Sequence, residues 1–331
     1  METTSNGRTP SGACVTMVLV GAELDDGDAL RTGIRSFLRI EAPPQTPTVR
    51  TLASWQEDGY VRHLVHLVTD DDAIPAFLAV PTGVGPFPGV VVSHQHAGQR
   101  HFGKSEVFGL VGDRYQAFGP ALARAGFVVL APDSIAFEDR RPTGPGTDPR
   151  DDDWQQHYNA LAYRLVAGDT LMRKVINDAM AAVSAMVARP DVKRDAVAAL
   201  GHSYGGNTTL FLTAVDERVR FACASGALAS YRRKMADGTG IEMAEVIPGF
   251  TTRFDLEHVL AAIAPRRFLV VSGTEDKYSA DAGEVIDLAR SAFRSAPRAL
   301  AHVRVDGGHA LDAQRFGSII NWMVSAVAGS Q

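Results

Sequence analysis

One short motif limits strongly what this chain can fold into. Residues 201–205 read Gly-His-Ser-Tyr-Gly, after the apolar run Val-Ala-Ala-Leu and shortly before Thr-Thr-Leu-Phe-Leu. This is the G-x-S-x-G pattern in the strand, turn and helix context that it requires. A serine at the tip of such a turn has a strained backbone, so Gly201 and Gly205 leave room where side chains would collide. We therefore expect Ser203 to stand above a sheet at a helix N-terminus, where backbone N–H groups can receive negative charge.

Two later segments supply the partners that a serine nucleophile needs. One apolar run ends in Gly-Thr-Glu-Asp at Asp276, and the next ends in Asp-Gly-Gly-His at His309. Serine, acid and histidine thus follow one another in the order that this motif requires. His309 is predicted to take the serine proton and Asp276 to orient the imidazole ring. Glu275 is the alternative acid, whereas Asp306 is better suited to shaping the glycine turn before the histidine.

The segment His-Gln-His-Ala-Gly, which follows the apolar run 89–93, is predicted to complete the site. Acyl transfer needs hydrogen-bond donors aimed at the developing oxyanion. We expect the backbone N–H of Tyr204 to be one donor and that of His96, or of Gln95, to be the other. His94 and His202 are expected to contact the substrate.

Neither a metal nor a cofactor is predicted. His94, His96 and His101 lie close together, but no H-E-x-x-H motif or cysteine set accompanies them. The glycines at 83 and 85 resemble the start of a phosphate loop. Their third partner, however, falls at position 89, and a strand rather than a helix follows.

Apolar runs and helical patterns alternate through most of the chain. Short apolar runs at 89–93 and 127–130 are typical of strands buried on both faces of a parallel sheet. Further strands are predicted at 61–68 and 74–80, and helices at about 28–40, 115–125, 170–189 and from 310 onward. This alternation predicts an α/β fold, with a mostly parallel central sheet flanked by helices.

The chain is predicted to divide at residue 54. Residues 1–54 would form a disordered tail (1 to about 12) and a helical extension, and residues 55–331 the catalytic domain. Two segments, about 138–160 and about 230–264, break the alternation of strand and helix. We expect both to be cap insertions over the carboxyl ends of the strands, where ligands of such sheets bind.

The composition of the chain limits the classes of partner that it can bind. A chain of 331 residues with 45% hydrophobic and 21% charged residues is typical of a soluble globular protein. The net charge of −5, without a concentration of Lys and Arg, argues against a nucleic-acid partner. No apolar run reaches the ~20 residues of a membrane span. The short apolar run 14–20 resembles the core of a signal peptide and is interpreted as uncleaved. Two distant cysteines predict no disulfide scaffold, so a cytoplasmic location is expected.

These residues give the chain a family resemblance. It resembles the α/β-hydrolase superfamily, in particular the bacterial branch similar to dienelactone hydrolases and acetyl esterases, over about residues 55–327. The likeness rests on Pro-Gly-Val-Val-Val-Ser-His at 88–94, Ala-Pro-Asp at 131–133, the motif at 201–206, Ala-Pro-Arg-Arg at 264–267, and the corners that end in Asp276 and His309. It implies cofactor-free ester hydrolysis with Ser203, Asp276 and His309 as triad. The chain departs from the family pattern at Gln95, where a glycine is usual, and in having serine where dienelactone hydrolases have cysteine.

The predicted function is that of a serine hydrolase. It would cleave a small-molecule carboxylic ester through an acyl-enzyme intermediate. A dedicated amide, thioester or lactone hydrolase of a specialised biosynthetic pathway is the alternative, because one triad serves all these substrates. A non-catalytic binding protein on the same fold is a remote alternative. The sequence leaves open whether the chain forms a homo-oligomer.

Overall fold

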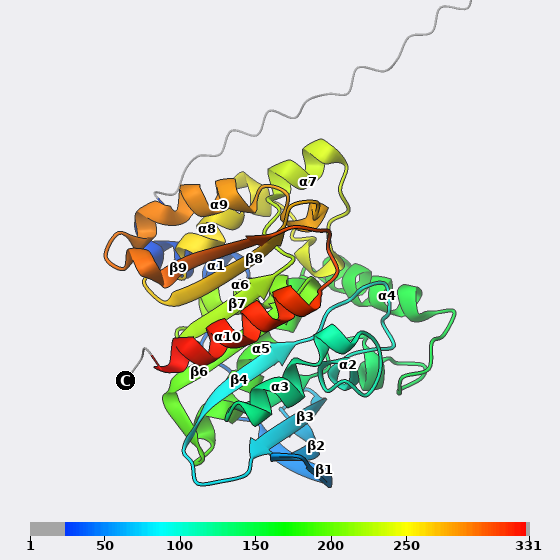
Figure 1. The fold of residues 1–331 in the computed structure, drawn as a ribbon. Helices are drawn as coiled ribbons and strands as arrows, with labels where there is room; N and C mark the ends of the chain where they lie inside the picture. The colour runs from blue at the N-terminus through cyan, green and yellow to red at the C-terminus, as the bar shows by residue number, and fades with distance from the viewer. Residues whose placement is uncertain (1–23, 329–331) are drawn as a thin grey trace, which may run out of the picture.

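A nine-stranded sheet runs through the molecule, in the order β1-β2-β3-β5-β4-β6-β7-β8-β9 (Figure 1). The computed structural model describes residues 24–328, so the predicted disordered tail and the run 14–20 lie outside the described residues. The strands are β1 Thr48–Glu57, β2 Tyr60–Val68, β3 Ala73–Pro81, β4 Phe87–Ser93, β5 Val128–Pro132, β6 Val192–His202, β7 Phe221–Ser225, β8 Arg267–Gly273 and β9 Leu300–Val305.

Most of the sheet is parallel, as predicted. The strands from β5 through β4, β6, β7 and β8 to β9 pair in parallel, whereas β1, β2 and β3 form antiparallel hairpins and β3 joins β5 antiparallel. The carboxyl ends of the six parallel strands therefore lie along one edge of the sheet. Residues that directly follow β4, β6, β8 and β9 are brought together at that edge.

Helices cover both faces of the sheet (Figure 1). They are α1 Gly27–Phe37, α2 Lys104–Val107, α3 Phe118–Arg124, α4 Asp153–Val166, α5 Leu171–Ala188, α6 Tyr204–Val215, α7 Tyr231–Asp237, α8 Leu256–Ala261, α9 Ala282–Ala289 and α10 Ala313–Ala328. One apolar core lies between the sheet and α1, α5, α6, α8 and α9, and a second lies beneath α3 and α10. The two cores explain why the central strands are apolar on both faces.

Local sequence signals set the ends of the helices that support the site. Thr170 accepts a hydrogen bond from the backbone N–H of Arg173 and so caps α5, which ends before Pro190. Ser230 caps α7 in the same way, and Gly238 closes that helix in the left-handed conformation. Within residues 24–328, no helix combines the length and the apolar character that crossing a bilayer requires.

The N-terminal boundary differs from the prediction. Residues 48–57 form β1, so a division after residue 54 would fall inside a strand that pairs with β2. This strand lies at the edge of the sheet, and nearly all of its residues are exposed, so it lacks the apolar alternation that marks a half-buried strand. The predicted helix 115–125 is also shorter, because a 3-10 turn, Arg114–Gln116, precedes α3.

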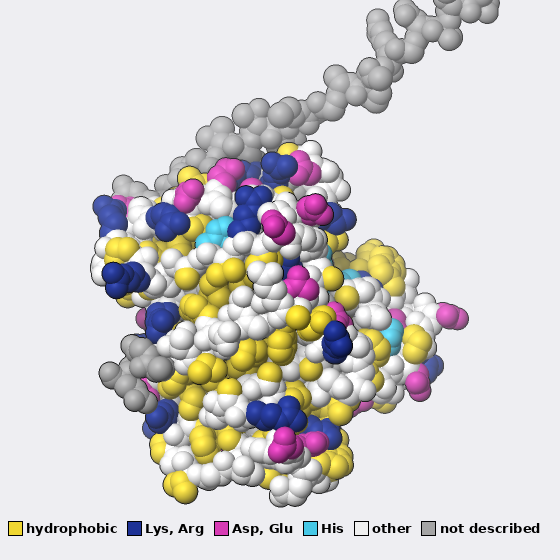
Figure 2. Space-filling model, viewed as in Figure 1, with side chains coloured by type: hydrophobic (Ala, Val, Ile, Leu, Met, Phe, Trp, Pro, Cys, Tyr) yellow, Lys and Arg dark blue, Asp and Glu magenta, His cyan; other side chains and the backbone are white. Residues whose placement is uncertain are grey.

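The two insertions contribute short helices rather than strands. The first contains a 3-10 turn, Glu138–Arg140, and most of α4; the second contains α7, two 3-10 turns and the whole of α8. Figure 2 shows basic and acidic side chains interspersed over the face that carries α3 and α10. Side chains of one charge sign do not gather into a patch on that face, in keeping with the small net charge.

Candidate active site

Ser203 occupies the sharp turn between β6 and α6. Its backbone has φ 57° and ψ −122°, a strained conformation for a residue with a side chain. A Cβ on Gly201 would collide with the backbone of Gly205, and a Cβ on Gly205 would collide with the carbonyl of Ser93. Both positions lack room for a side chain, as the sequence predicts, and Gly205 also lets the turn pack directly against the end of β4.

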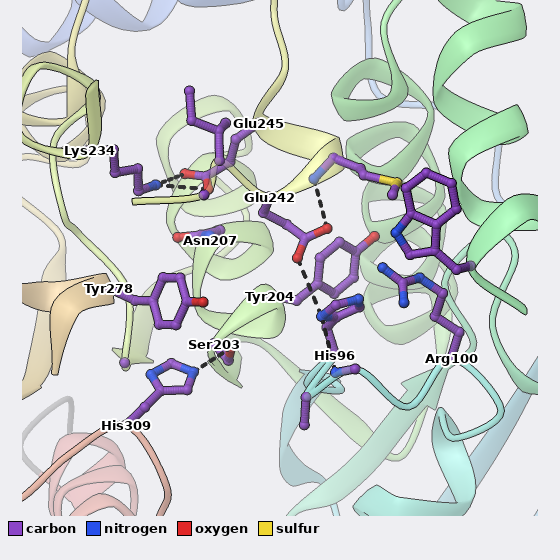
Figure 3. A pocket seen from close by; sticks show the side chains of 17 residues that line it. His96, Arg100, Ser203, Tyr204, Asn207, Lys234, Glu242, Glu245, Tyr278 and His309 are labelled. Carbon is purple, nitrogen blue, oxygen red and sulfur yellow. Dashed lines mark hydrogen bonds and ion pairs between the residues drawn. The ribbon is translucent and has the colours of Figure 1, made fainter. Parts of the chain in front are cut away.

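The structure brings the three predicted residues into one chain of hydrogen bonds. Ser203 Oγ lies 2.7 Å from His309 Nε2, and His309 Nδ1 lies 2.9 Å from Asp276 Oδ1. Asp276 follows β8 and His309 follows β9, so the carboxyl-end edge of the sheet supplies all three groups. Figure 3 shows His309 pointing at Ser203 from the side opposite His96. This is the geometry in which an imidazole can remove a serine proton.

Asp276 is held ionised by its partners. Burial raises the pKa of this carboxyl, but the hydrogen bond and charge of His309, with the hydrogen bond from Ser279, outweigh burial and lower it. Ser279 Oγ donates to Oδ2 at 2.9 Å, and the backbone N–H of Tyr278 donates to Oδ1 at 3.0 Å. The alternative acid, Glu275, is exposed and has no contact with the histidine.

Three backbone N–H groups close to the turn in sequence or at the cavity have no acceptor in the described chain. Tyr204 is the first residue of α6, and its N–H has no acceptor among residues 24–328. The N–H groups of Gln95 and His96 likewise have no acceptor within the described chain. His96 lines the cavity beside Ser203, whereas the Gln95 side chain turns away and donates to Glu106 Oε1 at 2.9 Å. The free N–H of Tyr204 lies at a helix N-terminus, where negative charge is stabilised.

His94 and His202 do not contact the cavity, and the expectation that they bind substrate is corrected. His94 is 2% exposed, donates from Nδ1 to the carbonyl of Gln95 at 2.7 Å, and accepts the Ser134 N–H at 3.0 Å. Burial lowers its pKa to about 4. His202 is fully buried, with its ring centroid 5.0 Å from that of His309. Both histidines lie behind the site. From sequence alone, a residue in this position cannot be distinguished from one that lines the cavity.

A cavity of about 500 Å³ opens over Ser203. Trp154 from the first predicted insertion, and residues 240–243 and Glu245 from the second, line it together with His96 and His309. Both insertions therefore border the cavity at the carboxyl ends of the strands. Trp154 stacks on Tyr158, with ring centroids 5.2 Å apart, and forms part of the rim.

Polar residues that the motif analysis did not single out line much of this cavity (Figure 3). Lys234 and Glu245 form a buried ion pair, with Nζ 2.8 Å from both carboxylate oxygens. Asn207 has a buried side-chain oxygen that finds no partner among the described residues. Burial raises the pKa of Glu242 to about 7. Only Asn207, one turn after Ser203 on α6, could have been found from spacing.

Two clusters bring together side chains that could ligate a cation. His96, His157 and Glu242 form one, and a second consists of Asp133, Glu138 and Asp139. The carboxylates of the second surround the ammonium of Lys104, which occupies their centre. In the first, Arg100 Nε donates to His157 Nδ1 at 3.0 Å, so Nδ1 is already occupied and the ring proton is on Nε2. Neither nitrogen of His157 is therefore available as a metal ligand. A guanidinium so close also repels a cation.

Comparison with known proteins agrees with this geometry. The model of the dienelactone hydrolase family matches residues 74–231, and that of the prolyl oligopeptidase family matches residues 162–325. The chain has the α/β-hydrolase fold. It is similar to dienelactone hydrolases, and it is an esterase-like enzyme that acts on ester bonds.

Individual relatives of this hydrolase are distant. YtaP of Bacillus subtilis (strain 168), assigned as a hydrolase, is 26% identical over 230 residues, which are 67% of this chain and 72% of that protein. A protein of Bacteroides fragilis assigned as an acetyl xylan esterase has a TM-score of 0.67 at 16% identity, covering 84% of this chain and 74% of that one. A glucuronoyl esterase from Solibacter usitatus has a TM-score of 0.65 at 15% identity, covering 90% and 91%. At these identities the solved structures show the fold alone.

Proposed function

We propose that this hydrolase cleaves a polar carboxylic ester with Ser203 as nucleophile, His309 as general base and acid, and Asp276 as the group that orients the imidazole. The observation that supports this most strongly is the unbroken series of hydrogen bonds from Ser203 Oγ through His309 to Asp276. A serine hydroxyl is a weak nucleophile at neutral pH until a positioned base removes its proton.

In the proposed reaction, Ser203 Oγ attacks the ester carbonyl while His309 Nε2 takes its proton. The backbone N–H groups of Tyr204 and of His96, or of Gln95, then hold the oxyanion, and each such donor contributes roughly 3–4 kcal/mol to lowering the barrier. His309 passes the proton to the departing alcohol, which leaves an acyl group on Ser203. A water molecule activated by the same histidine releases the acid and regenerates the serine.

The cavity favours a polar substrate over a long acyl chain. Charged and amide side chains from Arg100, Lys234, Glu242 and Asn207 border it, and a hydrocarbon chain would leave the side-chain oxygen of Asn207 without a hydrogen bond. The proteins assigned as acetyl xylan and glucuronoyl esterases, which share the fold, act on polar esters by their names. The compact volume of about 500 Å³ supports a small ester.

Amide hydrolysis is a second candidate. The family model of prolyl oligopeptidases covers residues 162–325, a range that includes Ser203, Asp276 and His309. The same three groups can cleave an amide when the cap positions an amine as leaving group.

A substrate panel tests the proposal. Short and long acyl nitrophenyl esters, a thioester, a lactone and an anilide are incubated with the wild type and with Ser203→Ala. We expect serine-dependent turnover of short polar esters and little of long-chain ones. Equal turnover by Ser203→Ala would refute the assignment of the nucleophile. Turnover of the anilide in preference to every ester would favour the amide alternative.

A further inference from the structure

The cavity wall contains a guanidinium group without an anionic partner. Arg100 is 6% exposed, and its Nε donates to Nδ1 of the fully buried His157 at 3.0 Å. Its two terminal nitrogens have no hydrogen-bond acceptor, and no carboxylate lies within ion-pair distance, among residues 24–328. Arginine stays charged when buried, and a buried charge normally has a counter-charge or a full set of hydrogen bonds.

The position of this guanidinium is fixed by the protein. The carbonyl of Arg100 accepts the Glu138 N–H at 3.1 Å, which ties the backbone to the first insertion. His157, on α4, holds the side chain through Nε and so leaves the outer face of the guanidinium free. Arg100 lines the cavity, and Figure 3 shows it on the same side as His96 and Glu242. The free face thus opens toward the space above Ser203.

The nearby carboxylates bind other groups or carry only part of a negative charge. Asp153 is paired with Arg141 at 2.5 Å. Glu245 is bound by Lys234 through both oxygens. Glu242 accepts the Met243 N–H at 2.8 Å, and burial raises its pKa to about 7, so it carries only part of a negative charge at neutrality. None of these carboxylates lies within ion-pair distance of Arg100, whose guanidinium stays charged at the cavity wall.

We infer that Arg100 binds a carboxylate of the substrate, separate from the ester that is cleaved, so that the enzyme acts on acid-bearing esters. The planar guanidinium fork matches the two oxygens of a carboxylate, and such charge-assisted pairs are among the strongest hydrogen bonds in proteins. This inference rests on the proposed function for the reaction, but the binding site itself is defined by Arg100 and His157. Sequence reasoning gave no sign of it.

Matched substrate pairs test the inference. Monomethyl glutarate and methyl 4-carbamoylbutanoate differ only in whether the acyl part ends in a carboxylate or an amide. The pair 4-acetoxybenzoate and 4-acetoxybenzamide places the same change on the alcohol part. We expect the wild type to favour the carboxylate member of at least one pair by about 10- to 100-fold in kcat/KM. Arg100→Met should abolish this preference, and Arg100→Lys should keep part of it.

A control variant distinguishes the loss of a positive charge at the cavity from the loss of a positive charge elsewhere on the protein. Arg298 is exposed and precedes β9 at the end of the strand opposite the site, so Arg298→Met should keep the preference. Circular dichroism and thermal unfolding check that Arg100→Met is folded, and comparing the two members of a pair within each variant removes any change in overall rate. A wild type without preference in either pair, or a preference that survives in Arg100→Met, would overturn the inference.

Binding without turnover distinguishes this inference from the proposed reaction. Calorimetry on Ser203→Ala with glutarate, 4-hydroxybenzoate and inorganic phosphate should detect a carboxylate that Ser203→Ala/Arg100→Met fails to bind. Tighter binding of phosphate than of either carboxylate would refute the carboxylate assignment. Arg100-dependent carboxylate binding in a protein whose Ser203 resists phosphonate labelling would support the site while refuting the proposed reaction.

Discussion

Replacing Asp276 by asparagine should slow the enzyme without unfolding it. An asparagine oxygen can keep the hydrogen bonds that Oδ1 now accepts from Tyr278 and His309. The new amide group would then face Ser279 Oγ, which can accept its hydrogen bond in place of donating one. The local structure therefore survives, and the main loss is the negative charge beside the imidazole.

The size of that loss follows from the geometry. Asp276 Oδ1 lies 2.9 Å from His309 Nδ1, and Asp276 is only 2% exposed, so solvent screens the pair weakly. Opposite charges roughly 4 Å apart attract by about 4 kcal/mol at an effective dielectric constant of about 20. The imidazolium forms only as the reaction proceeds, so this attraction stabilises the transition state. Its loss corresponds to a fall of about 10³-fold in kcat.

Steady-state kinetics on a turned-over ester would measure this change, with thermal unfolding as the check on folding. The matched control is Glu275→Gln, which neutralises the exposed neighbouring acid and should leave kcat unchanged. A loss smaller than about tenfold in Asp276→Asn would refute the electrostatic role. A large loss in Glu275→Gln instead would indicate that Glu275, and not Asp276, stabilises the imidazolium.

Three other expectations follow from the same structure. Gly205→Ala should destabilise the fold by about 1–3 kcal/mol and lower kcat, because its Cβ would displace the end of β4. The control is Gly283→Ala, at the equivalent position of α9, which has open space around it and should not destabilise the fold. Chemical denaturation measures the free energy of unfolding of both variants. Lys104→Met should cost about 3–5 kcal/mol of unfolding free energy by leaving three carboxylates without their cation. Burial, with Glu138 nearby, raises the pKa of Asp133 to about 7, and removing the ammonium would raise it further, so this loss should shrink as the pH falls toward 7 and the carboxyl takes up a proton in the variant. Because its lowered pKa keeps the Asp276 carboxyl ionised, Asp276→Asn should remain slower than the wild type at about pH 5 as well as at about pH 8; equal rates at about pH 5 would contradict an ionised carboxyl there.

The sequence was sufficient for the parts of the molecule that obey local rules. The turn at Ser203 needs two glycines at fixed spacing, and parallel strands place their carboxyl-end residues together, so the meeting of Ser203 with His309 could be predicted. The buried strands and α5 followed from apolar periodicity and from a cap and a proline. The edge strand β1 escaped prediction because nearly all of its residues are exposed, so burial imposes no apolar alternation on them.

The cavity could not be predicted because its residues come from separate loops. Arg100 follows β4, His157 lies on α4, and Lys234 and Glu242 belong to the second insertion. Their approach depends on how the insertions fold over the sheet, which no local pattern encodes. For the same reason His94 could not be separated from a residue in the cavity until its hydrogen bonds to the neighbouring loops were seen.

Trapping the intermediate tests the central claim most directly. A fluorophosphonate is added to the wild type, to Ser203→Ala and to His309→Asn, and intact mass spectrometry with peptide mapping measures the adduct. We predict one adduct per wild-type chain, located on Ser203, much slower labelling of His309→Asn, and none on Ser203→Ala. An adduct on another residue, or equal labelling of Ser203→Ala, would contradict the assignment of Ser203 as the nucleophile.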